Sequence, residues 1–384
     1  MMSPGQHPSL RTEVTELLGV PYPLLAFSHS KEVVVAVSRA GGFGVLGAAQ
    51  CDIEELEEKL AWLAAELGDT PFGVDLLLPG KYERADEGGL PREQLIAQVP
   101  DGHRRFVAEL MDEYGVPELE EGYEFGDVVD GRGVPVTGNH TYTAKDTQPL
   151  IDACLSSKIG LFANALGVAP PGVIDSFHDR GILVAGLAGT ARHGEKHKQA
   201  GTDIVIAQGY EAGGHTGEIG SMVLIPDVVD AVEGLPVLAA GGIASGRQMA
   251  AAMVLGAQGV WTGSVWLTTE ESEVIAPVKE KFVGAVASET VRSRSCTGRP
   301  ARQLRSAWTD AWEGEVEPLG MPHQGILYAE PQVRIARGAE ADAGRSRELA
   351  TYFVGQVVGR LNRVRPAGEV VEEMVTECAA LLTA

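Results

Sequence analysis

The stretch that decides the fold is Asp203-Ile-Val-Ile-Ala-Gln-Gly-Tyr-Glu-Ala-Gly-Gly-His215. Its apolar first half is typical of a strand that is buried on both faces, as in a parallel sheet. In the loop that follows, Gly213 and Gly214 let the backbone approach a ligand closely because they carry no side chain. His215 ends the loop, and histidine exchanges protons near neutral pH. A buried strand that ends in such a loop is where α/β enzymes place their active sites.

Seven further strand-like runs surround this one, and most are followed by a loop and an amphipathic helical pattern. The eight runs cover residues 23–27, 44–48, 72–78, 159–164, 182–186, 203–207, 236–240 and 259–262. Helical patterns cover residues 30–40, 52–67, 172–180, 191–200, 225–232 and 245–255. Eight βα units predict an α/β fold of the closed (β/α)8, or TIM barrel, type rather than an open sheet.

Two segments fall outside this alternation. Residues 79–158, between the third and fourth strands, are far more than a crossover needs, and they contain a helical stretch near 103–114. We expect this insertion to cover the barrel mouth as a lid. The alternation is also lost in the C-terminal part, where residues 345–362 are predicted to form a helix. The sequence therefore predicts a barrel over 15–290 and an extension over 291–384 that packs on it.

The composition excludes several classes of partner. The 384 residues include 53 acidic and 31 basic ones, which gives a formal net charge of -22 and disfavours binding to nucleic acid or to anionic membranes. Cys51, Cys154, Cys296 and Cys378 are scattered, which indicates a reducing compartment rather than a disulfide framework or a zinc knuckle. The sequence has neither a signal-peptide core near its start nor an apolar run that could span a bilayer. We therefore expect a cytoplasmic protein.

Glycine-rich loops follow the last two predicted strands. They read Ala-Ala-Gly-Gly-Ile-Ala-Ser over residues 239–245 and Thr-Gly-Ser over residues 262–264. In barrels, the loops after strands seven and eight commonly bind a phosphate with backbone N–H groups and a helix N-terminus. Tight turns would explain the same glycines, but both loops stand at the expected positions, which favours the phosphate site. The residues concerned are Gly241, Gly242, Gly263 and Ser264. The histidine after strand six would then lie across the mouth from the phosphate.

Another glycine pattern is misleading. Gly42-Phe-Gly-Val-Leu-Gly47 matches the G-x-G-x-x-G motif of dinucleotide-binding folds. That motif requires a strand before the glycines and a helix after them. Here a helical pattern precedes the glycines and a strand follows, so we interpret the run as a helix-to-strand turn.

Several of these motifs together resemble a known family. They are Ala207-Gln-Gly-Tyr-Glu-Ala-Gly-Gly-His-Thr-Gly217, Ala239-Ala-Gly-Gly-Ile243 and Gly256-Ala-Gln-Gly-Val-Trp-Thr-Gly-Ser264, extended by residues 39–47, 71–75 and 297–302. The combination is similar to the nitronate monooxygenases, or 2-nitropropane dioxygenase-like proteins, whose superfamily includes flavin-dependent enoyl-ACP reductases. The resemblance covers most of the chain except the insertion and the far C-terminus.

The resemblance implies a flavin mononucleotide (FMN) in a TIM barrel. It assigns the phosphate to Gly241, Gly242, Ile243, Gly263 and Ser264, and the remainder of the flavin site to Ala26, Asp75, Gln208, Gly213 and Gly214. His215 would act as base or proton donor. The implied reaction oxidises an alkyl nitronate or nitroalkane with O2 to a carbonyl compound and nitrite, and a homodimer is expected from fold analogy.

Two departures from the family pattern keep other functions open. The first-strand loop reads Leu25-Ala-Phe-Ser-His29 where the family usually has a Gln-Ala-Pro-Met-like sequence, and Asp75 replaces an asparagine that hydrogen-bonds the flavin. An ionised acid there would resist an anionic reduced flavin. The alternatives are a reductase in which NAD(P)H reduces FMN for an enoyl thioester, a non-catalytic flavin-binding barrel, and a flavin-free lyase or isomerase.

Other polar residues have two interpretations each. His193 and His197 have a spacing that can bind a metal, but no third ligand is apparent and a solvated helix face is favoured. Cys296 has basic neighbours that can lower a thiol pKa, which would make it nucleophilic. Glu211 is either a supporting partner in the site or a solvated side chain. The histidines that could reach the mouth but are more often structural are His29 and His140.

Overall fold

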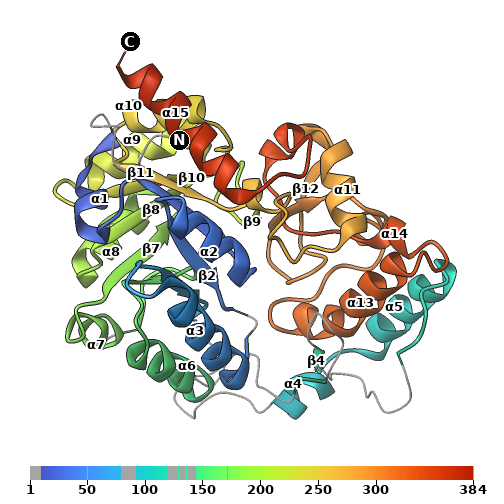
Figure 1. The fold of residues 1–384 in the computed structure, drawn as a ribbon. Coiled ribbons are helices and arrows are strands. Elements are labelled where there is room, and N and C mark those ends of the chain that lie inside the picture. Colours follow the sequence, from blue (N-terminus) through green and yellow to red (C-terminus); the bar gives the residue numbers. More distant parts are fainter. Residues whose placement is uncertain are drawn as a thin grey trace.

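Eight parallel strands close into a barrel in the order β1-β11-β10-β8-β7-β6-β3-β2, as Figure 1 shows. The computed structural model describes residues 10–49, 51–78, 92–119, 128–129, 135–136, 144–170 and 172–383. The barrel strands are β1 Leu24–Ser28, β2 Phe43–Gly47, β3 Gly73–Leu76, β6 Leu161–Asn164, β7 Leu183–Ala188, β8 Ile204–Gln208, β10 Val237–Ala240 and β11 Gly259–Thr262. Each overlaps a predicted run, so the predicted TIM barrel is confirmed.

Helices cover the outside of the barrel because their apolar stripes pack against the strands. They are α2 Lys31–Arg39, α3 Ile53–Leu67, α6 Ala144–Ser156, α7 Val173–His178, α8 Ala191–Ala200, α9 Ser221–Ala231 and α10 Gly246–Val254. The first helix, α1 Glu13–Leu18, instead contributes Val14 and Leu18 to the apolar cluster inside the barrel. In α3, Asp52 caps the N-terminus by accepting a hydrogen bond from the Glu55 amide at 2.8 Å. Leu56, Leu60 and Leu63 then form the buried stripe, at helical spacing.

The misleading glycine run begins just after α2, and its residues from Phe43 onward form β2. A Cβ atom on Gly44 would lie 2.4 Å from the Val34 carbonyl oxygen, so this glycine allows α2 to pack directly on the strand. A helix precedes the glycines, as read from the sequence, but the turn is confined to residues 40–42 and the remainder of the run is strand.

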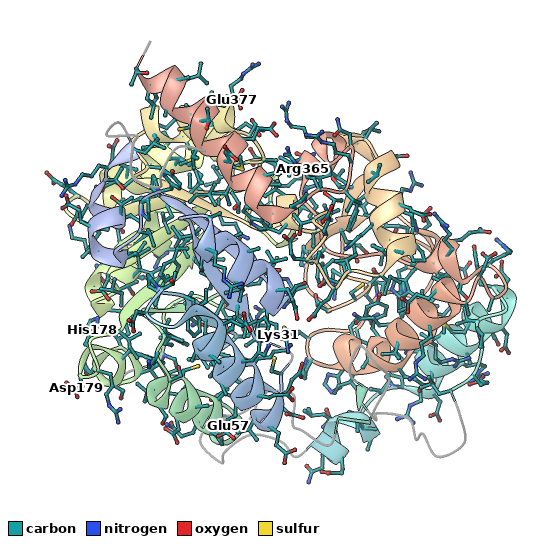
Figure 2. All side chains as sticks on the ribbon, in the orientation of Figure 1. Lys31, Glu57, His178, Asp179, Arg365 and Glu377 are labelled. Carbon is teal, nitrogen blue, oxygen red and sulfur yellow. The ribbon has the colours of Figure 1, made fainter. Side chains whose placement is uncertain are left out.

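The C-terminal helix, α15 Ala367–Leu382, occupies the eighth helix position of the barrel. After β11 and a short 3-10 helix, η3 Ser264–Trp266, the chain leaves the barrel and returns with α15 to pack against α10 and α2 (Figure 1). The packing is close, because a Cβ on Gly246 would lie 2.3 Å from the Met374 carbonyl oxygen. At the surface, the Arg247 amide donates to the Glu377 carboxylate at 3.0 Å, where Figure 2 labels Glu377. The barrel is therefore completed by residues far from β11 in sequence.

A second lobe, on the right in Figure 1, contains most of the chain between β11 and α15. Its elements are α11 Ala276–Gly284, η4 Ala287–Glu289, β12 Thr290–Ser293, β13 Ala301–Leu304, α12 Ala307–Ala311, α13 His323–Glu340, α14 Ser346–Leu349 and η5 Gln356–Arg360. Antiparallel pairing joins β13 to β12 and to β9 Gly214–His215, which belongs to the loop after β8. This small sheet links the lobe to the barrel mouth.

The predicted helix over residues 345–362 is wrong. The structure has only α14 and the 3-10 helix η5 there, with extended chain between them. The backbone of that connection bonds elsewhere: the Gly355 amide donates to Ser264 Oγ at 2.8 Å, and the Gln356 amide to the Glu211 carbonyl at 2.9 Å. Long-range bonds to the barrel loops thus replace the local bonds of a helix.

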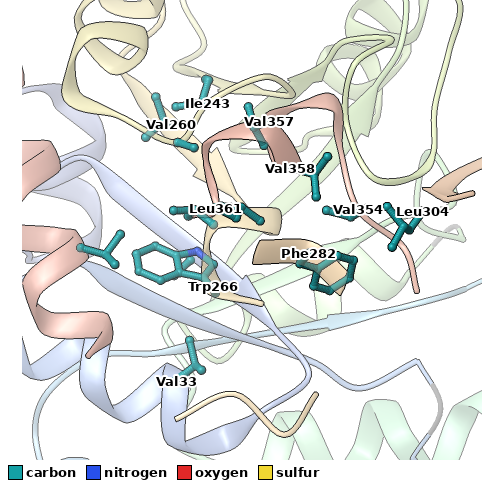
Figure 3. Packing of buried hydrophobic residues seen from close by; sticks show 14 of the residues in the cluster. Val33, Ile243, Val260, Trp266, Phe282, Leu304, Val354, Val357, Val358 and Leu361 are labelled. Atoms are coloured by element: carbon teal, nitrogen blue, oxygen red, sulfur yellow. The ribbon is translucent and has the colours of Figure 1, made fainter. Parts of the chain in front are cut away.

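The two parts are held together by one apolar core. Trp266, after β11, and Phe282, on α11, are completely or almost completely buried. Figure 3 shows them beside the side chains of the returning segment, namely Val354, Val357, Val358 and Leu361. Because this core is continuous between barrel and lobe, the lobe is fixed over the barrel rather than tethered to it.

The described parts of the insertion lie in two places. The helices α4 Arg92–Ala97 and α5 Asp101–Glu113 pack against α13 in the second lobe, whereas α6 packs against α3 on the barrel. The two-residue strands β4 Val128–Val129 and β5 Pro135–Val136 pair with each other. Residues 79–91, 120–127, 130–134 and 137–143 of the insertion, His140 included, lie outside the described residues. Among the described helices, none has the length and apolar character needed to cross a membrane.

Candidate active site

A cavity of about 2200 Å³ lies between the C-terminal ends of the barrel strands and the second lobe. The loops after all eight barrel strands contribute to its wall, and residues 321–340 and 350–357 close the opposite side. Nearly all the sequence-predicted site residues line it: Asp75, Gln208, Gly213, Gly214, His215, Gly241, Gly242, Ile243, Gly263 and Ser264. The structure therefore brings together residues that are spread over nearly 200 positions in sequence.

Ala26 is the exception. Its side chain is completely buried and packs in the core on the helix side of β1. Side chains alternate along a strand, so its neighbour Phe27 faces the cavity instead. Phe27 stacks on Trp261 with 6.1 Å between ring centroids and meets the His29 ring edge-on at 5.2 Å. The alternation of residues 24–28 was the signal that could have identified Phe27.

The two glycine loops present free amides to the cavity. Among the hydrogen bonds between described residues, none uses the amide of Gly242, Ile243 or Ser264 as donor. Glu211 lies behind Gly242, and its carboxylate accepts from the Ser221 amide at 3.0 and 3.1 Å, at the start of α9. Glu211 is thus a structural partner that holds a helix N-terminus, and the loop amides remain available to a ligand.

His215 lies on β9, opposite Ala301 of β13. Its Nδ1 lies 3.4 Å from the Pro300 carbonyl oxygen. A carbonyl can only accept, so this long hydrogen bond places the proton on Nδ1 and leaves Nε2 with its lone pair. Burial lowers the pKa of His215; the Pro300 carbonyl opposes this shift, and nearby Arg299 adds to it. The imidazole is therefore neutral at neutral pH, which is the state of a general base.

Asp75 lies on β3 with 2% of its surface exposed. Val74 and Leu76 pack outward against α3 and α6, so the alternation along the strand turns Asp75 into the barrel. Burial raises the pKa of the Asp75 carboxyl well above its ordinary value of 3.8. A protonated Asp75 carries no charge, so it would not repel an anionic reduced flavin.

Two of the three further candidates have structural explanations. The Cys296 thiol lines the cavity, but it donates to Gln303 Oε1 at 3.0 Å and burial raises its pKa to about 12, so it is no thiolate nucleophile. His197 is buried and bonds to the Leu187 carbonyl at 3.2 Å, whereas His193 lines the cavity. No cluster of three metal-ligating side chains occurs in the described part of the chain.

The wall also contains His29, which the sequence placed near the mouth, and a group of residues that sequence reasoning missed. His29 is held by a hydrogen bond between its Nδ1 and the Gly47 carbonyl at 2.8 Å, and burial lowers its pKa. The second lobe adds aromatic and polar side chains from several elements, among them Tyr328, Gln332 and Tyr352. No local pattern marks these residues as cavity-lining, because their position depends on how the lobe packs over the barrel.

Comparison with known proteins identifies the family. A family model for nitronate monooxygenase matches residues 13–377. The chain belongs to the nitronate monooxygenase family. It is 52% identical over 370 residues to "Putative monooxygenase Rv1533" of Mycobacterium tuberculosis, covering 96% of both chains. It is 33% identical over 317 residues to a probable nitronate monooxygenase of Staphylococcus saprophyticus, covering 77% of this chain and 79% of the relative.

Solved structures agree with the nitronate monooxygenase assignment. A nitroalkane oxidase from Streptomyces ansochromogenes superposes with a TM-score of 0.77 at 26% identity, covering 96% of this chain and 99% of that one. FabK from Thermotoga maritima gives a TM-score of 0.69 at 26% identity, with 97% of each chain covered. The protein is therefore a flavin-dependent oxidoreductase built on a TIM barrel.

Proposed function

We propose that the protein is an FMN-dependent nitronate monooxygenase. It would oxidise an alkyl nitronate, or a nitroalkane after loss of its α-proton, with O2 to a carbonyl compound and nitrite. Three features support the proposal: the family membership, the free amides of the two glycine loops, and a neutral histidine in the same cavity. The histidine carries the argument, because removal of the α-proton of a neutral nitroalkane needs a positioned base.

The donor set of the cavity fits FMN. A phosphate dianion accepts hydrogen bonds, and the unengaged amides of Gly242, Ile243 and Ser264 are donors. A flavin ring needs apolar faces and uncharged polar groups, which Phe27, Trp261 and Gln208 supply from the strand ends. When bound, FMN would supply the redox chemistry of the reaction.

His215 would act on the substrate before that redox chemistry. In a nitroalkane, the carbon next to the nitro group carries the acidic hydrogen, and Nε2 of His215 would accept it. Pro300 would hold the imidazole in the required tautomer through Nδ1. A nitronate has already lost this proton. Comparing the two substrates therefore separates the contribution of the base from that of the later oxidation.

The test replaces His215 with asparagine, which keeps a polar group but removes the base. We expect kcat/KM for a nitroalkane to fall by roughly 10²- to 10⁴-fold, while the matching nitronate is still oxidised. His193→Asn is the matched control, because His193 also lines the cavity. Equal losses on both substrates, or equal losses in both variants, would count against His215 as the base.

A reductase is the second candidate, and the cavity volume favours it. At about 2200 Å³ the cavity exceeds the roughly 300–1,000 Å³ of a usual ligand pocket, so it has room for a nicotinamide nucleotide or a thioester beside the flavin. The lowered pKa of His215 favours the first candidate, because little imidazolium is present at neutral pH to donate a proton. Anaerobic spectra separate the functions: nitronate bleaches the flavin of a monooxygenase, and NAD(P)H bleaches that of a reductase. A flavin that neither compound reduces would indicate a non-catalytic barrel.

A further inference from the structure

Asp75 is the one titratable residue in the eight barrel strands, all of which the structure describes. It is paired in the ladder with Gly47 of β2 and Ala163 of β6. Ala163 and the other inward-facing residues around it form the apolar cluster inside the barrel. A carboxyl group in this position is costly unless it stays uncharged.

The Asp75 side chain has no hydrogen-bond or ion-pair partner among the described residues, yet it lines the cavity. The neighbouring strands β2 and β6 contain no charged residue. Charged side chains elsewhere in the cavity wall include Lys31, Glu55, Glu58, Lys59 and Glu273. His29 lies against Gly47, the ladder partner of Asp75, and Lys59 of α3 acts on this histidine. Burial lowers the pKa of His29, so this neighbour is neutral at neutral pH and supplies no counter-ion. Asp75 thus points into the ligand cavity as an unpaired, nine-tenths buried polar group.

We propose that Asp75, as an uncharged carboxylic acid, donates a hydrogen bond to the bound flavin. This hydrogen bond is lost when the carboxyl ionises, so that a single residue of β3 makes the affinity for flavin depend on pH. The inference rests on the proposed function only in that a flavin occupies the cavity. A protonated aspartate has nearly the size and shape of asparagine, and both can donate. Ionisation would replace the donor with a negative charge in an apolar barrel, beside a ligand that already carries phosphate charge.

The pH dependence follows from linkage. If the protonated form binds flavin better, the pKa of Asp75 is higher in the complex than in the free protein. Between these two pKa values, the Kd of the flavin rises by up to about tenfold per pH unit, because binding requires uptake of one proton. An asparagine at this position cannot ionise and should abolish this contribution.

The experiment measures the Kd of FMN by fluorescence quenching for wild type, Asp75→Asn and Asp75→Leu, from mildly acidic to alkaline pH. We expect the wild-type Kd to rise with pH and the Asp75→Asn Kd to stay nearly flat. Asp75→Leu, which keeps the bulk without a donor, should bind more weakly at all pH values. The flavin ring also titrates at alkaline pH, but it does so equally in all variants, so the difference between wild type and Asp75→Asn is the readout.

Infrared difference spectra of the flavin-free proteins provide a second measurement that does not depend on binding or on the folding of the leucine variant. Wild type minus Asp75→Asn should show the C=O band of a protonated carboxylic acid at neutral pH. Parallel Kd curves for these two proteins, or absence of that band, would overturn the inference while leaving the proposed function intact. A wild-type protein that binds no flavin at any pH would overturn both.

Discussion

Replacing Asp75 with asparagine should stabilise the flavin-free protein, and by an amount that grows with pH. In the unfolded chain the carboxyl loses its proton near the ordinary pKa of 3.8, whereas in the folded protein burial raises the pKa well above this value. Between the two pKa values the folded state holds one proton more than the unfolded state. The free energy of unfolding of the wild type therefore falls as pH rises through this window.

The slope follows from the linkage alone. One pH unit changes the free energy by about 1.4 kcal/mol for each proton, so raising the pH by two units within the window should cost the wild type about 2.7 kcal/mol. Asparagine at position 75 does not titrate, and this term is absent in the variant. All other titratable groups are common to both proteins and cancel in the difference.

Urea unfolding of the two flavin-free proteins at several pH values, starting just above pH 4, tests this prediction. We expect the midpoint of Asp75→Asn to exceed that of wild type by a margin that increases with pH and levels off at the folded-state pKa. A constant margin across the series would mean that Asp75 ionises as readily in the folded protein as in the unfolded chain. The description of Asp75 as a buried, unpaired acid would then be wrong.

Three other predictions concern different parts of the molecule. Because the pKa of His215 is lowered from 6.5, kcat/KM for a nitroalkane should rise with pH through this depressed pKa and be level by neutral pH, whereas a plateau reached only in alkaline solution would contradict the assignment. Gly246→Ala should lower the melting temperature strongly, because its Cβ would meet backbone atoms of α15 at 2.3 and 2.5 Å; Gly102→Ala on α5, where the Cβ meets nothing within 4 Å, should stabilise by roughly 0.5–1 kcal/mol. Cys296 should resist thiol reagents at neutral pH until the protein unfolds, because it is buried and its pKa is raised to about 12; mass mapping after brief labelling measures this.

The strands could be predicted from the sequence because a barrel strand is buried on both faces and therefore reads as a short apolar run. The role of α15 could not. A helical segment near the C-terminus does not reveal that it fills the gap between α10 and α2, since this depends on the fit of Met374 against Gly246, more than a hundred residues away. The helix expected over residues 345–362 failed for a related reason: bonds to Ser264 and Glu211 determine the backbone there.

The residues of the site also fall into a part that could be predicted from the sequence and a part that could not. The glycine loops and His215 belong to barrel strands whose order is fixed by the fold, so their convergence followed from counting strands. The second lobe reaches the same cavity through the pairing of β13 with β9, which is a contact between residues 301 and 215 that no local pattern encodes. The resemblance points to the loop around Ala26, whereas the alternation along the strand decides that the side chain of Phe27 faces the cavity.

The charge state of the site is the property that is hardest to predict from the sequence. The net charge of -22 and the presence of an aspartate among the site residues do not determine the charge of the cavity. Burial does, because it disfavours the charged form of acids and bases alike: it raises the pKa of Asp75 and lowers the pKa of His29 and His215. With Asp75 protonated, these three groups are uncharged around the ligand site. An anionic nitronate would then meet no fixed negative charge from the barrel strands, and a free imidazole would be ready to accept the proton of a neutral nitroalkane.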